Sequence, residues 1–117
     1  MEKVYNLEER TYQFAKSCRI YISKLPKTIC NLEDSKQLAR SSGSIGANYI
    51  EANEKLGDKD FAFRLKISRK EAKESKYWLN LLHEMNPMLS HKSEILITEV
   101  EEIRKIFSAI INKTKIS

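Results

Sequence analysis

Positively charged side chains gather between residues 64 and 76, in a pattern suited to chemistry with a polyanion. If this segment is helical, five of them share one arc at about 100° per residue: Lys66, Arg69, Lys70, Lys73 and Lys76. A nucleic-acid backbone requires several cations within reach of successive phosphates, and Arg64 and Arg40 would extend the patch if the fold brings them near. The alternative is a solvated, lysine-rich face without a ligand.

Three aromatic residues suggest a second kind of contact with nucleic acid, base stacking. Tyr49, Tyr77 and Trp78 could stack on unpaired bases, although we favour packing in the core or between subunits. The sequence contains no zinc finger, ribonucleoprotein-type aromatic motif or helix-turn-helix pattern. Binding is therefore expected to follow backbone charge and shape rather than base sequence.

Four polar residues lie in otherwise apolar or small-residue surroundings: Arg40, Asn48, Glu51 and Glu74. Buried polar groups must pair with one another or with the backbone. Arg40 and Glu51 are too far apart to pair on one helix, so we expect partners on the next helix or on a neighbouring chain. We interpret the set as a structural polar network in preference to an acid–base pair.

The remaining candidates for catalysis or metal binding are weak. The segment Gly43-Ser44-Ile45-Gly46 lacks both the Gly-Lys-Ser/Thr end of a P-loop and the Gly-x-Ser-x-Gly pattern of a nucleophile elbow. His83 and His91 belong to no ligand quartet, and Cys18 and Cys30 have no metal-ligand spacing. We expect no enzyme activity, no metal and no cofactor, and we interpret both cysteines as buried or partly buried thiols.

Composition predicts a single helical domain over residues 1–117. Three Gly and two Pro leave little material for the turns of a β fold. The net charge of +5 permits a polyanionic partner. No apolar run approaches the ~18–20 residues of a membrane span, and the charged start MEKVYNLEER has no signal-peptide core. We expect a cytoplasmic protein that does not enter a membrane.

Apolar periodicity predicts two helices in the first half of the chain. One runs from about Asn6, as N-cap, to Leu25, where Pro26 ends it. A loop over 26–31 precedes a second helix at about 32–56. Gly43 and Gly46 each cost a helix about 1 kcal/mol relative to Ala. We nevertheless predict one continuous helix, because its apolar face persists through the glycines and small residues allow close packing.

The second half predicts two more helices. The third is expected from Asp58, as N-cap, to about Met85, and the fourth from about Ser90 to Lys115. The third carries a core seam with small residues at its centre: Phe61, Leu65, Ser68, Ala72, Ser75, Leu79 and Leu82. A second apolar strip suggests an oligomer interface: Phe63, Ile67, Trp78 and Leu81, with Met85 at its end. We expect the second and third helices to pack closely through their small residues.

Four amphipathic helices with short connections predict an all-α fold, an antiparallel up-down-up-down four-helix bundle. Among proteins with this fold, the chain resembles a bacterial family of four-helix-bundle proteins, known as the 23S rRNA intervening-sequence protein or S23 ribosomal protein. The matching pieces occur in the family's order and spacing: Leu25-Pro26-Lys27, Gln37-Leu38-x-Arg40-Ser41, Ser44-Ile45-x-Ala47-Asn48-Tyr49-Ile50-Glu51-Ala52, Asp60-Phe61, Leu65-x-Ile67-Ser68 and Glu74-Ser75-x-Tyr77-Trp78-Leu79.

The resemblance implies a homopentamer with a central channel. Some family members are encoded within insertions in rRNA genes, and a related branch serves as accessory protein to the reverse transcriptase of diversity-generating retroelements. Two hypotheses follow. One is a non-enzymatic oligomeric scaffold that binds RNA or DNA through basic faces, and the other is a protein-interaction module, for example for a reverse transcriptase, without nucleic-acid binding of its own.

Overall fold

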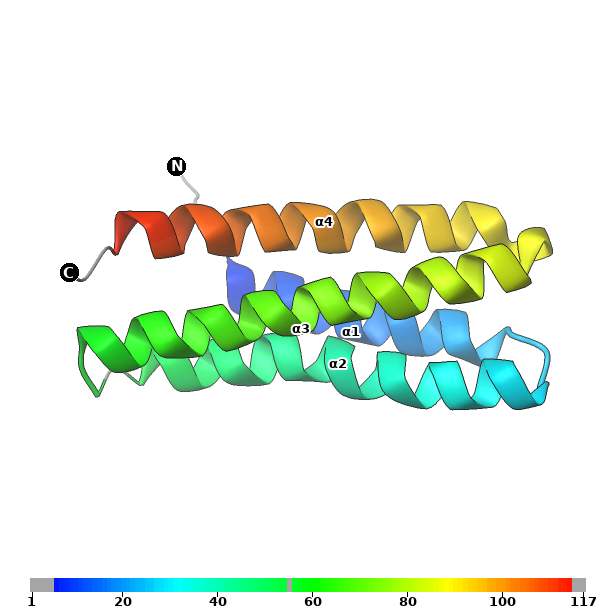
Figure 1. The fold of residues 1–117 in the computed structure, drawn as a ribbon, viewed down its shortest axis with the longest axis horizontal. Helices are drawn as coiled ribbons and strands as arrows, with labels where there is room; N and C mark the ends of the chain where they lie inside the picture. Colours follow the sequence, from blue (N-terminus) through cyan, green and yellow to red (C-terminus); the bar gives the residue numbers. More distant parts are fainter. Residues whose placement is uncertain (1–5, 55, 115–117) are drawn as a thin grey trace.

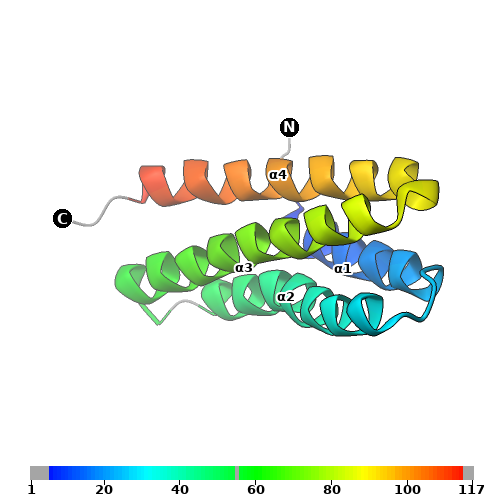
Figure 2. The same ribbon diagram turned by 45° about the vertical axis from the view of Figure 1, so that its right-hand side comes forward.

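A computed structural model describes residues 6–54 and 56–114, which form four antiparallel helices (Figure 1). The elements are α1 (Leu7–Ser23), α2 (Ile29–Asn53), α3 (Asp58–Met85), a 3₁₀ turn η1 (Pro87–Leu89) and α4 (Ser90–Lys113). In both ribbon views α2 runs beside α3, and α4 lies along the opposite side of α3 (Figures 1 and 2). The predicted all-α, up-down-up-down four-helix bundle is confirmed.

The first two helices begin at polar caps. The Asn6 side chain accepts a hydrogen bond from the Glu9 backbone at 3.1 Å, which confirms the predicted N-cap of α1. The predicted loop over 26–31 is too long, because Thr28 caps α2 by accepting from the Asn31 backbone at 3.1 Å. This helix therefore begins at Ile29, and it ends at Asn53, earlier than predicted.

The third helix spans its predicted range, but its cap differs from the prediction. Gly57 is the N-cap residue, with φ at +141°, a conformation that favours glycine, and no side chain caps this end. Asp58 instead lies in the first turn, where the helix dipole favours a carboxylate. The fourth helix ends at Lys113, and Lys115, the predicted end, lies outside the described residues.

The core lies between the four helices and uses the seam predicted for α3. Leu65, Ala72, Leu79 and Leu82 are buried, whereas Phe61 is only partly buried. The other helices contribute the remaining large buried side chains, among them Leu7, Phe14, Tyr21, Leu38, Ile45, Val100, Ile103 and Phe107. No helix among the described residues has the length and apolarity needed to cross a membrane.

Buried serines form the contact between α2 and α3. The Ser75 hydroxyl donates to the Ser41 hydroxyl at 2.8 Å, and the Ser68 hydroxyl donates to the Ile45 carbonyl at 2.9 Å. These short side chains let the two backbones approach closely while every hydroxyl keeps a partner. The predicted close packing of the second and third helices through small residues is confirmed.

The glycines of α2 face α1 instead of α3. The helix continues through Gly43 and Gly46 as predicted. A Cβ at Gly46 would lie 2.8 Å from Thr11 Oγ1, so α1 packs against a position with no room for a side chain. A Cβ at Gly43 would meet only the far end of the Arg19 side chain, at 3.3 Å. The two glycines therefore have different roles.

A reciprocal amide pair joins the two chain reversals at one end of the bundle. Asn31 and Asn86 donate to each other's side-chain carbonyl at 2.9 Å in both directions. Asn31 also donates to the Pro26 carbonyl at 2.8 Å, and Asn86 to the Leu82 carbonyl at 2.9 Å. Both side chains are buried, so the α1–α2 loop and the α3–α4 turn share one satisfied polar cluster.

The two glycines of α2 should respond oppositely to alanine. We expect Gly43→Ala to raise the free energy of unfolding by up to about 1 kcal/mol, because the flexible Arg19 tip can shift. Gly46→Ala should lower it by about 1–3 kcal/mol, because Thr11 is buried and its hydroxyl donates to the Leu7 carbonyl at 2.6 Å. Urea denaturation followed by circular dichroism measures both, and Thr11→Ala should partly rescue Gly46→Ala. Equal stabilisation by both glycine variants would contradict this packing.

Candidate nucleic-acid interface

Three lysines of α3 form an exposed row, which we call the lysine row: Lys66, Lys70 and Lys73. All three are exposed. Within the described part of the chain, Lys66 and Lys73 take part in no ion pair, whereas Lys70 Nζ lies 3.5 Å from Glu71 Oε2. The row has two uncompensated charges, two helical turns apart, and a third that is partly neutralised.

The other cations predicted for the interface are held within the bundle. Arg69 donates to the Ser108 hydroxyl of α4 at 3.3 Å, and Lys76 Nζ lies 3.2 Å from Glu101 Oε1. Arg64 pairs with Asp60 at 3.7 Å, one turn earlier on α3. We expected the cations from Lys66 to Lys76 to be segregated on one face without simple i,i+4 ion pairs. The ion pairs that involve them join Lys76 to Glu101 of α4 and Lys70 to its neighbour Glu71.

Glu101 is the centre of an ion-pair cluster between α3 and α4. It accepts from Arg104 at 3.1 and 2.6 Å and from Lys76 at 3.2 Å. Hydrogen bonds from Arg104, reinforced by Lys76, lower the pKa of this carboxyl to about 2. Its charge therefore persists over a wide pH range and removes Lys76 from the set of cations available to a ligand.

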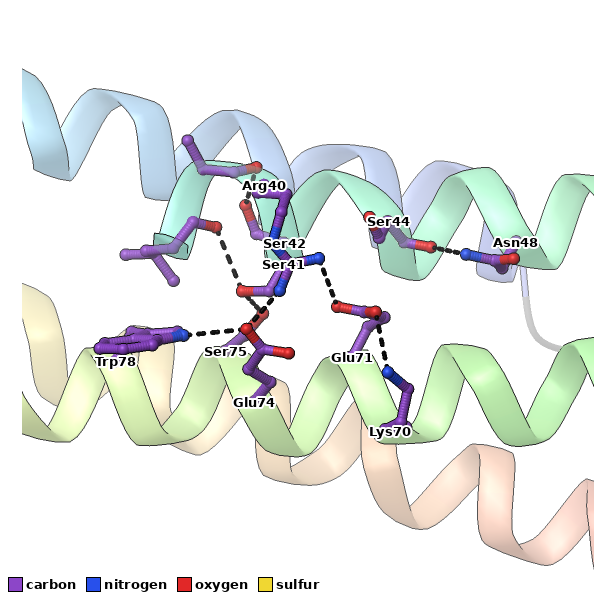
Figure 3. Close-up of polar contacts among 12 residues, drawn as sticks. Arg40, Ser41, Ser42, Ser44, Asn48, Lys70, Glu71, Glu74, Ser75 and Trp78 are labelled. Carbon is purple, nitrogen blue, oxygen red and sulfur yellow. Dashed lines mark hydrogen bonds and ion pairs between the residues drawn. The ribbon is translucent and has the colours of Figure 1, made fainter. Parts of the chain in front are cut away.

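A second ion-pair cluster, which we call the Arg40 cluster, joins α2 to α3 (Figure 3). Arg40 donates to Glu71 at 3.2 Å and to Glu74, and Trp78 Nε1 donates to Glu74 at 3.1 Å. The Arg40 bond and then the Trp78 bond lower the pKa of Glu74. The side chain of Glu71 is only 8% exposed. An ionised carboxylate this deeply buried needs the cation that α2 supplies.

Only two of the four residues of the predicted polar network contact each other in the structure. Arg40 and Glu74 are in direct contact, as part of the Arg40 cluster. Asn48 lies further along α2 and donates to the Ser44 carbonyl at 2.9 Å (Figure 3). Glu51 is exposed. The sequence did not indicate Glu71 as a member, because its burial depends on how α3 is rotated toward α2.

The predicted oligomer strip occupies a further face of α3. Phe63 is 61% exposed, and Met85 at the strip's end is also exposed. The other three residues are partly buried: Ile67, Trp78 and Leu81. Trp78 packs against the edge of the core while its indole N–H is held by Glu74. This leaves an apolar surface next to the lysine row, on the same helix.

The three aromatic residues considered for base stacking have different environments. Tyr49 is partly buried and makes an edge contact with Phe107, with ring centroids 5.7 Å apart. Trp78 and Tyr77 are in edge contact at 4.9 Å, with an interplanar angle of 80°. Tyr77 is 58% exposed. Only its ring, among these three, lies mostly in solvent.

The residues considered for catalysis or metal binding do not converge. Cys18 is buried as predicted, whereas Cys30, near the start of α2, is exposed, so its predicted burial is wrong. Burial raises the pKa of the Cys18 thiol to about 12, so it stays protonated and is a poor nucleophile. His83 Nδ1 lies 2.6 Å from the Ser93 hydroxyl, which also contacts the carbonyls of Leu89 and Ser90. Among the residues placed by the structure, no three His, Cys, Asp or Glu side chains gather to hold a metal ion.

A groove between α1 and α2 was not anticipated from the sequence. It has a volume of about 470 Å³, and Gly43 and Gly46 lie along its α2 side. Exposed Tyr12 and Ile50 add apolar surface, and Arg19 stands on its α1 side. The guanidinium of Arg19 donates to the carbonyls of Ala15 and Ala39. Apolar residues at helical spacing on the outer faces of the first two predicted helices could have indicated this groove.

Comparison with known proteins shows where this architecture recurs. The family model of the 23S rRNA-intervening sequence protein matches residues 3–109. A crystal structure from Bacteroides thetaiotaomicron, described as a protein of unknown function from the S23 ribosomal protein family, is 30% identical to this chain. The TM-score is 0.78, and the match covers 89% of this chain and 96% of that chain. A search among curated proteins found no match.

Acid should weaken the bundle through Glu101. A carboxyl whose pKa is lowered by folding stabilises the folded state fully above its ordinary pKa near 4.5, and this contribution is lost as pH falls toward about 2. We expect wild-type stability to drop across this window and Glu101→Gln to show a shallower drop. Thermal unfolding at a series of pH values measures it. Glu94→Gln, an exposed carboxyl on the same helix, is the control and should retain the wild-type slope. An unchanged slope in Glu101→Gln would contradict the assignment.

Proposed function

The chain belongs to the 23S rRNA-intervening sequence protein family, and from that premise we propose that it is a cytoplasmic, non-enzymatic oligomeric scaffold that binds nucleic acid, RNA above all. The observation that carries this proposal is the lysine row, in which Lys66 and Lys73 are exposed and have no ion pair among the described residues. These ammonium groups are available to neutralise phosphates. Arg40 and Glu74, two of the four polar residues considered above, are engaged in a structural ion pair.

The number of free cations determines what kind of binding is expected. Two or three phosphate contacts per chain give a weak, salt-sensitive interaction without base specificity. Repetition of the row around an oligomer would convert weak contacts into useful avidity, because each further contact becomes intramolecular. The proposed RNA binding therefore depends on oligomerisation.

The apolar strip supports such an assembly. Phe63 is mostly exposed, and Ile67, Trp78 and Leu81 present further apolar surface on the same side of α3. We propose that these residues contact a neighbouring subunit, in the homopentamer that the family resemblance implies. At about 100° per residue, Lys66 and Lys73 point roughly 60–100° away from the strip. Assembly through the strip would leave both lysines accessible.

The groove between α1 and α2 favours a second candidate function. Its apolar lining and the cations Lys16 and Arg19 would suit a protein partner, such as a reverse transcriptase, contacted without use of the lysine row. A reverse-transcriptase gene beside this one, together with unchanged partner binding after reversal of Lys66 and Lys73, would favour this alternative. Placement of the gene inside an rRNA gene would favour the scaffold.

Charge reversal on the lysine row should reduce RNA affinity. We expect wild-type protein to bind a fluorescein-labelled RNA at about 50 mM salt and to lose affinity steeply by about 200 mM. The plot of log affinity against log salt has a negative slope. In the double variant Lys66→Glu/Lys73→Glu this slope should be shallower by about 1.4 for each chain engaged, since two phosphate contacts are lost. Fluorescence anisotropy measures both. Lys70 is left unchanged because its reversal would also disturb Glu71.

The matched control for this experiment is Lys16→Glu/Lys92→Glu. It changes the net charge equally, through two exposed lysines on α1 and α4. It should retain most of the wild-type affinity. If both double variants lose affinity equally, net charge and not the lysine row determines RNA binding, which contradicts the assignment of the row. Absence of wild-type binding at low salt would refute the proposal.

Replacement of Phe63 should weaken the assembly. Native mass spectrometry should show wild-type protein at a multiple of the 13.6 kDa chain, with five chains expected. Phe63→Glu should shift the population toward smaller species, because a charge in an apolar interface is costly to desolvate. Tyr12→Glu, at a 63% exposed position on α1, is the control and should not alter the mass. A wild-type sample containing only monomer would contradict the use of this strip.

A further inference from the structure

We infer that Tyr77 is a stacking platform for an unpaired base, so that the nucleic acid bound along α3 is single-stranded at this point. This inference rests on the proposed function, because it uses the same lysine row. It adds a ligand class, single strands, and a residue that discriminates single strands from duplexes.

The position of Tyr77 relative to the lysines is fixed by α3. Tyr77 follows Lys73 by four residues, a spacing that places two side chains on the same face of a helix, one turn apart. Lys66 precedes Lys73 by seven residues, or about two turns. The two free cations and the aromatic ring therefore follow one line along the helix over about 16 Å. A strand held by the lysines would pass the ring.

The ring is held in place by its neighbours. The rings of Tyr77 and Trp78 form a T-shaped contact at 4.9 Å and 80°, and in either arrangement of such a pair the indole covers at most one face of the phenol. Trp78 is fixed in turn by its hydrogen bond to Glu74, which Arg40 binds. An exposed aromatic ring already held by a neighbouring ring loses little conformational entropy when a base stacks on it.

The other aromatic residues fit this role less well. Tyr49 is partly buried against Phe107, and Trp78 is partly buried against the core. Tyr12 is as exposed as Tyr77, but it stands on α1 beside the groove, away from the lysine row. Tyr77 alone among these four combines exposure with neighbouring uncompensated cations.

The chemistry of stacking selects single strands. Bases in a duplex are already stacked on one another, so a duplex can offer α3 only its phosphates. Unpaired bases can turn toward an aromatic face, and such stacking tolerates any base because every base has a π face. Lysine contacts should therefore bind both forms, and Tyr77 should add affinity for the single strand alone.

Anisotropy titrations of a labelled oligouridylate and of a duplex RNA with equal phosphate number test this inference. Wild-type protein should prefer the single strand, and Tyr77→Ala should lose about tenfold in affinity for it with little change for the duplex. Tyr77→Phe should retain the wild-type preference, whereas Tyr77→Leu, which keeps apolar bulk without a π face, should lose it. Tyr12→Ala is the matched control and should behave as wild type.

The single tryptophan of the chain provides a second measurement. Because Trp78 touches Tyr77, a base stacked on Tyr77 should change tryptophan emission with the same midpoint as the anisotropy. The same titration of Tyr77→Leu should give a much smaller change. This signal depends on the geometry of the site and would not accompany lysine–phosphate contacts alone.

The outcomes separate this inference from the proposed function. If wild-type protein binds neither RNA at low salt, the proposed function fails and the stacking site with it. If single strand and duplex bind equally and Tyr77→Leu binds both as wild type does, only the stacking site is refuted. If Tyr77→Leu and Tyr77→Ala instead change the oligomer mass, Tyr77 belongs to a subunit contact and the inference is overturned.

Discussion

The close approach of α2 and α3 is the contact on which the rest of the molecule depends. Serine hydroxyls at this contact bond across the helices, from Ser75 to Ser41 and from Ser68 to the Ile45 carbonyl. Larger side chains there would separate the backbones. At this separation Arg40 of α2 reaches Glu71 and Glu74 of α3. The buried serines thus permit the close approach of α2 and α3, and the Arg40 cluster depends on it.

The contact between α2 and α3 also constrains side chains further along α3. Glu74, held by Arg40, binds the indole of Trp78, and Trp78 braces Tyr77. A side chain on α2 therefore helps to set the position of an aromatic ring on the outer surface of α3. Charge around α3 follows the same packing. Arg40 of α2 and Lys76 beside α4 meet carboxylates, whereas Lys66 and Lys73, which face away from both helices, have no ion pair within the described part of the chain.

Features that repeat along one helix could be predicted from the sequence. The four helices, the Asn6 cap, the continuity of α2 through Gly43 and Gly46, and the core seam of α3 all follow from local signals and periodicity. The start of α2 was misplaced because Thr28, a good capping residue, was assigned to a loop. Gly57 replaced Asp58 as the cap of α3 because the turn needs a positive φ.

Features that depend on the rotation of one helix against another could not be predicted. The pairing of Lys76 with Glu101 joins residues on different helices, and no local pattern marks it. The burial of Glu71, the placement of the glycines against Thr11, and the separation of Asn48 and Glu51 from the Arg40 cluster have the same origin. The number of free cations on the candidate interface was therefore overestimated.

The amide pair of Asn31 and Asn86 has a consequence for how the chain selects its topology. The pair joins residues 55 positions apart, so it forms only when the α1–α2 and α3–α4 hairpins are aligned in the native register. A slip of one helical turn would break both amide–amide bonds and leave the two buried side-chain carbonyls without donors, at a cost of about 1–3 kcal/mol each, although each amide N–H would keep its backbone acceptor. These two asparagines thus disfavour near-native alignments that hydrophobic packing alone would tolerate.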